Sequence, residues 1–188
     1  MCKSLDKMSL EELWQLFPIF LVEHNAKWAE WYECEAKRIV SLLPQKSIKR
    51  ISHIGSTAIP NIWAKNIVDI LLEVEKHDDL VIAKNILSSN GWLCMSCTTY
   101  RISMNKGYTP SGFADRVFHL HIRVLGDNNE LYFRDYLLAN PTIAKDYETL
   151  KLSLWKIFEH NRYGYTEAKS DFVNKYTDIA KEEYGNRY

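Results

Sequence analysis

The chain has 188 residues, and its 24 basic side chains balance its 24 acidic ones, so the formal net charge is zero. This length predicts one domain over residues 1–188 with a sizeable core, and the lack of a basic surplus argues against a nucleic-acid partner. No apolar run reaches the roughly 20 residues of a membrane-spanning helix, and residues 1–7 lack the apolar core of a signal peptide. We therefore expect a cytoplasmic protein without a membrane partner.

The first half of the chain alternates between helical and extended patterns. A capping box, Ser9 to Glu12, opens a short helix, and residues 17–22 read as a strand. An amphipathic pattern predicts a helix over 26–43. Residues 47–54 form the next expected strand, which ends directly before a Gly-Ser pair.

The second half begins with a nearly all-apolar run, residues 67–74, which is typical of a central strand covered on both faces. We expect a helix over 78–89, strands over 92–104 and 117–124, and a loop over 107–112. The last third is helical, with helices predicted over 130–139, 142–158 and 165–184. The order predicts an α/β or α+β domain in which helices flank a small mixed sheet.

The four cysteines include one C-x-x-C pair, Cys94 and Cys97. The flanking residues look extended, so a spacing of three places the two sulfurs on opposite strand faces. Since no second ligand pair lies nearby, we expect neither zinc nor redox chemistry there, and we expect Cys2 and Cys34 to be reduced as well.

Gly55 and Ser56 directly follow the expected strand over 47–54. A glycine lets backbone approach a ligand closely, and free N–H groups with a serine hydroxyl favour phosphate. The alternative is an ordinary strand-to-helix turn with a capping serine.

Asp69 lies in the middle of the apolar run. A carboxylate there is costly to bury unless it is paired or binds a metal, so metal or catalytic use is our first interpretation and a structural role the second. Glu73 lies ~13 Å further along the strand, too far to share an ion, and we expect it to be solvated.

His119 and His121 alternate with Leu120, so in a strand both rings point to one face, ~6.6 Å apart. They are candidate metal ligands or general bases, or simply hydrogen-bonded sheet histidines. His53 is a weaker third candidate.

Two further groups of side chains are suited to an anionic ligand. One comprises Arg101, Asn105, Lys106 and Arg116, around the expected loop between the last two strands; the other is Tyr165 with Lys169, on one face of the last helix. A solvated loop and an amphipathic helix start are the alternatives.

Five motifs occur together in one order: residues 53–60 (His-Ile-Gly-Ser-Thr-Ala-Ile-Pro), 64–70 (Ala-Lys-Asn-Ile-Val-Asp-Ile), 119–121 (His-Leu-His), 133–137 (Phe-Arg-Asp-Tyr-Leu) and 165–170 (Tyr-Thr-Glu-Ala-Lys-Ser). With this pattern the chain resembles the GrpB family, over roughly residues 20–180. The family is placed in the nucleotidyltransferase superfamily. The resemblance implies a nucleotidyltransferase-like fold.

The resemblance also implies a cleft in which Gly55 and Ser56 hold nucleotide phosphates and Asp69 is the first metal carboxylate. Thr57 and Lys65, in the same two motifs, join the expected nucleotide-binding residues. The superfamily usually has a second acid two residues after the first, and here that position is Leu71. A standard two-metal mechanism therefore lacks one ligand, unless His119 or His121 replaces it.

Three functional hypotheses follow. The first is a metal-dependent nucleotidyl or phosphoryl transferase acting on a small molecule, with Mg²⁺, Mn²⁺ or Zn²⁺ as cofactor and Asp69 and Ser56 in the catalytic centre. The second is a non-catalytic module that binds a nucleotide or another small anion, which Leu71 favours. The third is a single-metal hydrolase that uses Asp69 with the two histidines.

Overall fold

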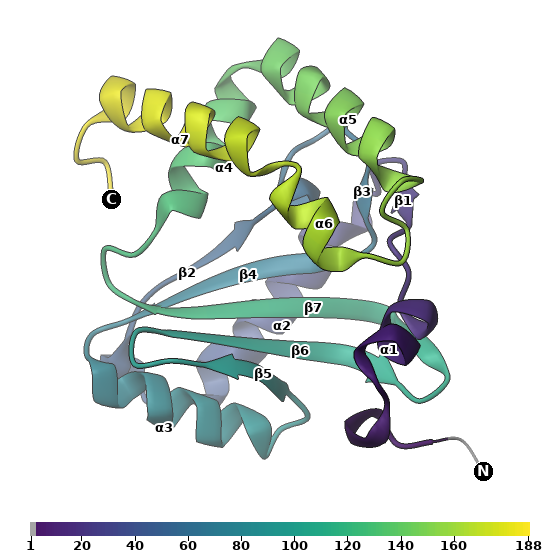
Figure 1. The fold of residues 1–188 in the computed structure, drawn as a ribbon. Coiled ribbons are helices and arrows are strands. Elements are labelled where there is room, and N and C mark those ends of the chain that lie inside the picture. The colour runs from purple at the N-terminus through teal and green to yellow at the C-terminus, as the bar shows by residue number, and fades with distance from the viewer. Residues whose placement is uncertain (1–2) are drawn as a thin grey trace.

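A five-stranded mixed sheet forms the centre of the protein, whose computed structural model describes residues 3–188 (Figure 1). The strand order is β2-β4-β7-β6-β5; β4 and β7 are parallel, and every other pair is antiparallel. The predicted mixed sheet with flanking helices is thus confirmed. The strands are β2 (Ile48–Ile54), β4 (Val68–Val74), β5 (Leu93–Cys97), β6 (Arg101–Thr109) and β7 (Gly112–Val124).

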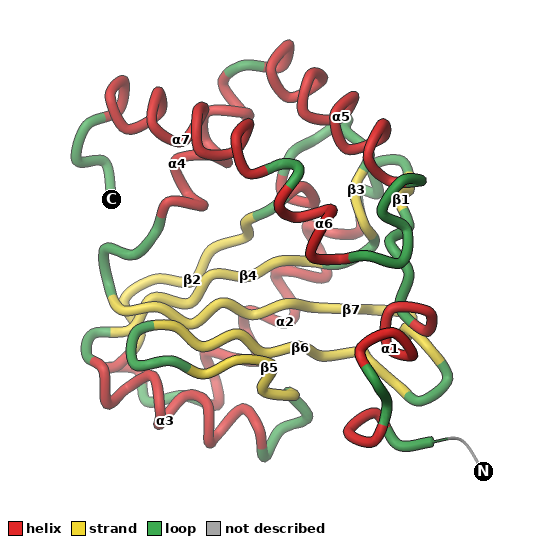
Figure 2. The backbone as a smooth tube through the Cα atoms, in the orientation of Figure 1, coloured by secondary structure: helices red, strands yellow, loops and turns green. Residues whose placement is uncertain are grey.

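Seven α-helices and a two-stranded sheet surround this centre within residues 3–188 (Figure 2). The small sheet pairs β1 (Leu21–Val22) with β3 (Ala64–Lys65). A short 3₁₀ segment, Ser56–Ala58, follows β2. The helices are α1 (Leu10–Leu16), α2 (Lys27–Leu42), α3 (His77–Ser88), α4 (Asn129–Ala139), α5 (Pro141–Trp155), α6 (Arg162–Glu167) and α7 (Ser170–Tyr184).

The two faces of the main sheet differ in chemistry. Val68, Ile70, Leu72 and Val74 of β4 belong to a buried apolar cluster that includes side chains from α2 and α3. The opposite face carries Asp69 and the side chains in register with it, and we call it the site face. Helices α4 to α7 gather beyond the β2–β4 side of the sheet (Figure 1). This alternation by two along β4 explains how one apolar run carries a carboxylate without disturbing the core.

Several predicted boundaries are wrong, and turn residues are the cause. The expected loop over 107–112 is instead the tip of a long hairpin, in which Tyr108 pairs with Phe113. The expected strand over 92–104 is two strands, β5 and β6, joined by a turn at Thr98. The predicted strand over 17–22 is reduced to β1, and the last predicted helix is divided into α6 and α7.

Gly107 allows the hairpin to continue where a loop was expected. Its φ is +90°, and an added Cβ would overlap the carbonyl oxygen of Arg116 on β7. The register shifts at this point between Lys106 and Tyr108. Such a bulge turns the following side chain toward the other face of the sheet, so Tyr108 joins the site face while Lys106 lies on the opposite one.

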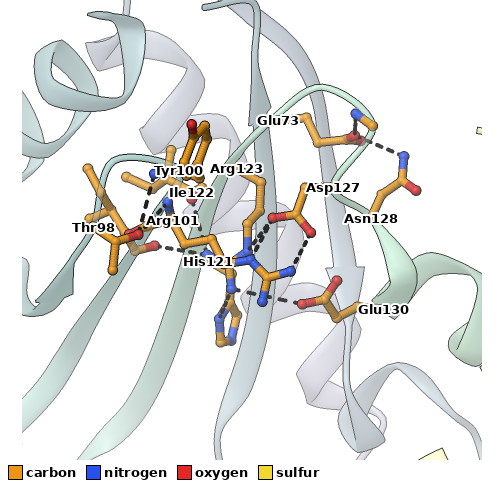
Figure 3. A network of polar contacts seen from close by, with 12 residues as sticks. Glu73, Thr98, Tyr100, Arg101, His121, Ile122, Arg123, Asp127, Asn128 and Glu130 are labelled. Atoms are coloured by element: carbon orange, nitrogen blue, oxygen red, sulfur yellow. Dashed lines mark hydrogen bonds and ion pairs between the residues drawn. The ribbon is translucent and has the colours of Figure 1, made fainter. Parts of the chain in front are cut away.

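Glu73 is fully buried, so the expectation that it is solvated is wrong. Its carboxylate lies 2.6 Å from Arg50 Nε. It also accepts hydrogen bonds from the Gly126 backbone at 3.1 Å and from Asn128 Nδ2 at 3.0 Å (Figure 3). These bonds tie the end of β4 to β2 and to the start of α4. Glu73 is therefore a structural anchor of the sheet.

We expect Glu73→Gln to lower the free energy of unfolding by about 1–3 kcal/mol, because it removes, from a fully buried position, the charge that compensates the half-buried Arg50. The exposed neighbour Glu75, which pairs with Lys49, is the matched control, and Glu75→Gln should change stability by less than about 0.5 kcal/mol. Urea unfolding of both variants measures the difference. Equal stabilities would contradict the anchoring role.

The C-x-x-C pair also differs from expectation. A bulge lies between Cys94 and Ser96, and it places Cys94 opposite Met104 and Cys97 opposite Ile102. Both partners point to the same sheet face, so the prediction of opposite faces is wrong. Cys34, Cys94 and Cys97 are free and exposed, while Cys2 lies outside the described residues. In the described part of the chain, no helix combines the length and the apolar character needed to cross a bilayer.

Candidate functional site

The Gly55 turn lies directly against the Asp69 carboxylate. The antiparallel register pairs Ile54, the last residue of β2, with Asp69 of β4. Gly55 has φ +71°, and a Cβ at this position would overlap Asp69 Oδ2 and lie 3.0 Å from its Cγ. Only glycine therefore lets the turn and the carboxylate share this space.

Two histidines of β7 point their ring nitrogens at Asp69. Nδ1 of His119 lies 3.1 Å and Nε2 of His121 lies 3.8 Å from Asp69 Oδ1. Burial by itself raises the pKa of Asp69, but hydrogen bonding from the two imidazoles outweighs burial and holds the pKa below its ordinary value. Asp69 is thus a carboxylate at neutral pH.

A chain of hydrogen bonds fixes the tautomer of His119. Arg162 Nη1 donates to the Tyr108 hydroxyl at 3.1 Å, and that hydroxyl lies 2.8 Å from His119 Nε2. Burial lowers the pKa of His119 to about 4, so the ring is neutral. A neutral ring that donates from Nδ1 to Asp69 must accept at Nε2 from Tyr108. Both nitrogens of His119 are therefore engaged.

His121 is oriented in a similar way. Its Nδ1 lies 3.4 Å from Arg123 Nη2, a group that can only donate. Because Nδ1 accepts from the guanidinium, Nε2 carries the ring proton, on the side of Asp69. Both imidazoles present N–H groups to the carboxylate, which fixes the orientation of the carboxylate.

Beside Asp69 lies a small cationic cavity of about 120 Å³. We call it the lysine cavity, because Lys65, Lys151 and Lys169 line it, and Asp69 is the only carboxylate among the lining residues that the structure describes. The other lining residues are Leu21, Gly55, Ser56, Thr57, Ile67, Tyr147 and Tyr165.

Each lysine reaches the lysine cavity from a different element. Lys65 ends β3, where it pairs with Leu21 of β1, and Lys169 lies between α6 and α7. Lys151 of α5 donates to the carbonyl of Trp63, whose backbone N–H in turn donates to Glu148 at 2.6 Å. These bonds hold α5 against the segment that leads into β3.

The three amines are difficult to protonate together in this environment. Burial is the main cause, and the neighbouring cations add to it: the pKa falls to about 7 for Lys65 and Lys151 and to about 8 for Lys169, where Asp69 partly offsets burial. The amines are therefore partly neutral in the free protein, and an anion in the cavity would favour their charged forms.

A second cavity, of about 540 Å³, adjoins the lysine cavity. Both cavities include Gly55, Ser56, Asp69 and Tyr147 in their lining. Burial raises the pKa of Tyr147 to about 12, although the Ser56 side chain, which hydrogen-bonds to it, acts in the opposite direction. Apolar side chains form much of the larger cavity, among them Ile54, Ile59, Phe133, Leu137 and Val173.

The predicted basic cluster does not form. Lys106 pairs with Glu35 of α2 on the opposite face of the sheet, and Arg116 lies over the ring of Trp31, also of α2. Arg101 lines the larger cavity but is held by Asp127 through two hydrogen bonds of 2.7 Å (Figure 3). The sequence placed these residues around a loop, whereas they alternate along strands and so point to different faces.

The other predicted residues divide between the two sides of the sheet. Asn105 is buried in register with His119, on the site face. Thr57 lines the lysine cavity, but its hydroxyl lies 3.0 Å from His53 Nε2. His53 stacks on Tyr32 of α2 with ring centroids 4.8 Å apart, away from Asp69. His53 therefore takes no direct part in the site.

Sequence reasoning missed Lys151, Tyr147, Tyr108 and Arg162. A signal for Lys151 exists: the buried residues of α5 are Ala144, Tyr147, Glu148 and Lys151, which follow the spacing of one helix face. A lysine on the inward face of a helix marks either a buried pair or a ligand site. Tyr108 gave no comparable signal, because its direction depends on the bulge.

A resident metal does not fit Asp69, His119 and His121 as they are arranged. Both imidazoles direct protons, not lone pairs, toward the carboxylate, and among residues 3–188 no three His, Cys, Asp or Glu side chains form a group that could hold a metal ion. A divalent cation that arrives with phosphate groups needs only one or two protein carboxylates. Asp69 fits that role.

Comparison with known proteins identifies a family. The model of the family described as "GrpB protein" matches residues 18–178. The glutamate-rich protein GrpB of Alkalihalophilus pseudofirmus is 32% identical over 166 residues, covering 84% of this chain and 92% of that protein. UPF0157 protein YqkA of Bacillus subtilis is 31% identical over 92% of this chain, which spans about half (51%) of that relative's length.

A solved structure supports the same relationship. The crystal structure of conserved protein GrpB from Enterococcus faecalis superposes with a TM-score of 0.76 at 29% identity, and the match covers 88% of this chain and 99% of that one. The predicted nucleotidyltransferase-like fold is thereby confirmed.

Proposed function

This chain belongs to the GrpB family, and from that premise we propose that it is a phosphoryl or nucleotidyl transferase whose donor is a phosphate-bearing small molecule such as a nucleotide. One observation carries the proposal: Gly55, Ser56 and Asp69 lie at the junction of a cationic cavity and a larger, mostly apolar one. A ligand with an anionic end and an organic body matches this pair of cavities.

The residues divide the work between the two cavities. The lysine cavity binds phosphate through its amines and through the Ser56 hydroxyl, and the larger cavity receives the organic part of the donor or the acceptor. The reacting phosphorus then lies at the junction, beside Asp69. An acceptor oxygen bonds to it while the bond to the leaving phosphate breaks, and positioning with charge stabilisation supplies the catalysis.

Asp69 would hold a divalent cation that enters with the phosphates, Mg²⁺, Mn²⁺ or Zn²⁺, and such an ion would neutralise charge on the phosphate oxygens. His119 and His121 keep the carboxylate oriented. Tyr108 and Arg162 in turn keep His119 in the donating tautomer.

A non-catalytic nucleotide- or anion-binding module is the second candidate function. Leu71 favours it, because this fully apolar side chain occupies the site-face position two residues after Asp69 and is 1% exposed. A single carboxylate suffices to bind a ligand but leaves a two-metal mechanism incomplete. A hydrolase with a His-ligated metal is not favoured, since both nitrogens of His119 are engaged.

We expect ATP, GTP, CTP or UTP with Mg²⁺ or Mn²⁺ to raise the melting temperature of the protein, and one of them to be turned over in the presence of an acceptor. Ser56→Ala should weaken nucleotide binding about tenfold, since it removes a hydroxyl at the junction of the cavities. Ser111→Ala, in the exposed β6–β7 turn, is the control. Thermal shift, titration calorimetry and nucleotide turnover measure these effects.

Two outcomes separate the candidates. A melting-temperature shift without turnover under any nucleotide–metal combination supports the binding module. No shift with any nucleotide, with or without Mg²⁺, Mn²⁺ or Zn²⁺, contradicts both.

A further inference from the structure

The charge and the hydrogen-bond donors of the lysine cavity indicate a more specific ligand than anions in general. We propose that it is a dedicated site for a multiply charged terminal phosphate, a phosphomonoester dianion or a diphosphate, and that it rejects singly charged anions. The inference rests on the proposed function in one respect, since both place phosphate in this cavity.

The balance of charge supports this ligand class. Three lysines line the cavity, against the single carboxylate of Asp69, so with all three amines protonated the lining carries an excess of two positive charges. Lys65 and Lys169 form no ion pair among residues 3–188; their amines lie 6.0 Å and 4.2 Å from the centroid of the Tyr165 ring. A group with two or more negative charges is needed to compensate them, and a carboxylate or a phosphodiester carries only one.

Tyr165 supplies an independent sign of a missing ligand. It is 1% exposed and lines the lysine cavity, and its hydroxyl has no hydrogen-bond partner among residues 3–188. A buried hydroxyl without a partner costs free energy. A phosphate oxygen in the cavity would accept a hydrogen bond from this hydroxyl.

The donors also match a tetrahedral anion in number. The Lys151 amine gives one of its three protons to the Trp63 carbonyl and keeps two. The amines of Lys65 and Lys169, the Tyr165 hydroxyl and the Ser56 side chain approach from other elements. A phosphate dianion has three terminal oxygens that accept several hydrogen bonds each, so it can use donors from all sides.

Binding should be coupled to protonation of the lysines. At pH 9 the amines, with pKa values of about 7 to 8, are mostly neutral in the free protein, and at pH 7 about half or more carry charge. An anion stabilises the charged forms, so it takes up protons as it binds. The charged and titratable groups that face these amines are Asp69 of β4, His119 of β7, Lys145, Tyr147 and Glu148 of α5, and Arg162 and Tyr165 of α6.

Titration calorimetry with simple anions tests the inference without any nucleotide or metal. Pyrophosphate should bind, and acetate should not. Sulfate, a dianion at every pH used, should bind at least about tenfold more weakly at pH 9 than at pH 7, and in two buffers of different ionisation enthalpy it should show proton uptake at pH 8.

Variants locate the site. Lys169→Met should weaken pyrophosphate binding at least tenfold and Tyr165→Phe severalfold, whereas Lys175→Met, at an exposed position of α7, should leave it unchanged. The corresponding variants of the other two lysines, Lys65→Met and Lys151→Met, test the same site. Lys169 is only partly buried, so Lys169→Met still tests the site if those two variants do not fold.

The outcomes distinguish this inference from the proposed function. The protein could bind pyrophosphate in a way that depends on Lys169 and Tyr165, yet transfer no phosphoryl or nucleotidyl group. That result supports the phosphate site and contradicts the proposed transferase activity. Transfer that persists in Lys169→Met, with no pyrophosphate or sulfate binding to the parent protein, overturns the site alone. Equal pyrophosphate affinity in Lys169→Met, Tyr165→Phe and Lys175→Met also overturns it.

Discussion

Asp69→Asn should reduce phosphoryl or nucleotidyl transfer by about 10²–10³-fold or more, the loss typical when one charge-stabilising group is removed from a preorganised site. Asparagine keeps the shape of the side chain and an oxygen that can accept from His119 Nδ1. It loses the charge that would hold a cation beside the phosphates. The expected loss is therefore in turnover and not in folding.

The same variant should bind pyrophosphate more tightly than the parent protein does. Asp69 is the one carboxylate in the described lining of the lysine cavity, so its neutralisation removes a repulsion. We expect a gain of roughly threefold to tenfold, the effect of about 1 kcal/mol. This opposite change in binding and turnover is not expected of a residue whose role is only structural.

Turnover measured beside calorimetry, with melting temperature as a check of folding, tests both effects. Asp146→Asn, at an exposed position of α5, is a control with the same change of net charge. Transfer that is equal in Asp69→Asn and Asp146→Asn would show that Asp69 does not take part in the reaction.

Gly55→Ala should be the most damaging small substitution in the site. The added Cβ would overlap Asp69 Oδ2, and the backbone is at φ +71°, where L-residues are strained. Its backbone, at φ +71° and ψ −172°, lies in a region essentially restricted to glycine, which contributes about 1–3 kcal/mol, and the overlap forces either the turn or the carboxylate to move. We expect a loss of about 2–4 kcal/mol in the free energy of unfolding and loss of transfer.

Gly91→Ala separates the two causes. Gly91 also has a positive φ, +87°, but a Cβ there meets nothing within 4 Å. Its variant should lose only the backbone part, about 1 kcal/mol, and keep full activity. Denaturant unfolding of both variants measures the two losses in the free energy of unfolding. Equal losses would mean that the close contact between Gly55 and Asp69 does not contribute to the effect of Gly55→Ala.

Local patterns were sufficient for the elements whose determinants are close in sequence. The capping box at Ser9 is formed as predicted, and the apolar run at 67–74 is a central strand between β2 and β7. The Gly-Ser pair does end a strand beside Asp69, because an antiparallel register brings Ile54 opposite Asp69. The Gly-Ser pair and the single acid in an apolar strand were enough to identify Gly55, Ser56 and Asp69 as candidate site residues.

Patterns failed where turn residues occur inside a strand. Gly107, Pro110 and Gly112 together read as a loop, yet the first is a bulge, the second lies in a tight turn and the third begins β7. Glu73 read as a solvated strand end because its partners, Arg50 and Asn128, are 23 and 55 residues away. Side-chain partners at such distances leave no local trace in a single sequence.

The sequence by itself indicated the residues at the centre of the candidate site: Gly55, Ser56, Asp69 and the two histidines of β7. Their relation depends on strand alternation and register, which period-two patterns encode. The tertiary structure alone decided the environment of that centre. Lys151 reaches the cavity because α5 packs against the segment before β3, and Tyr108 reaches His119 because a bulge turns it. Helix packing and bulges depend on contacts between distant segments, and so does the charge of the cavity they create.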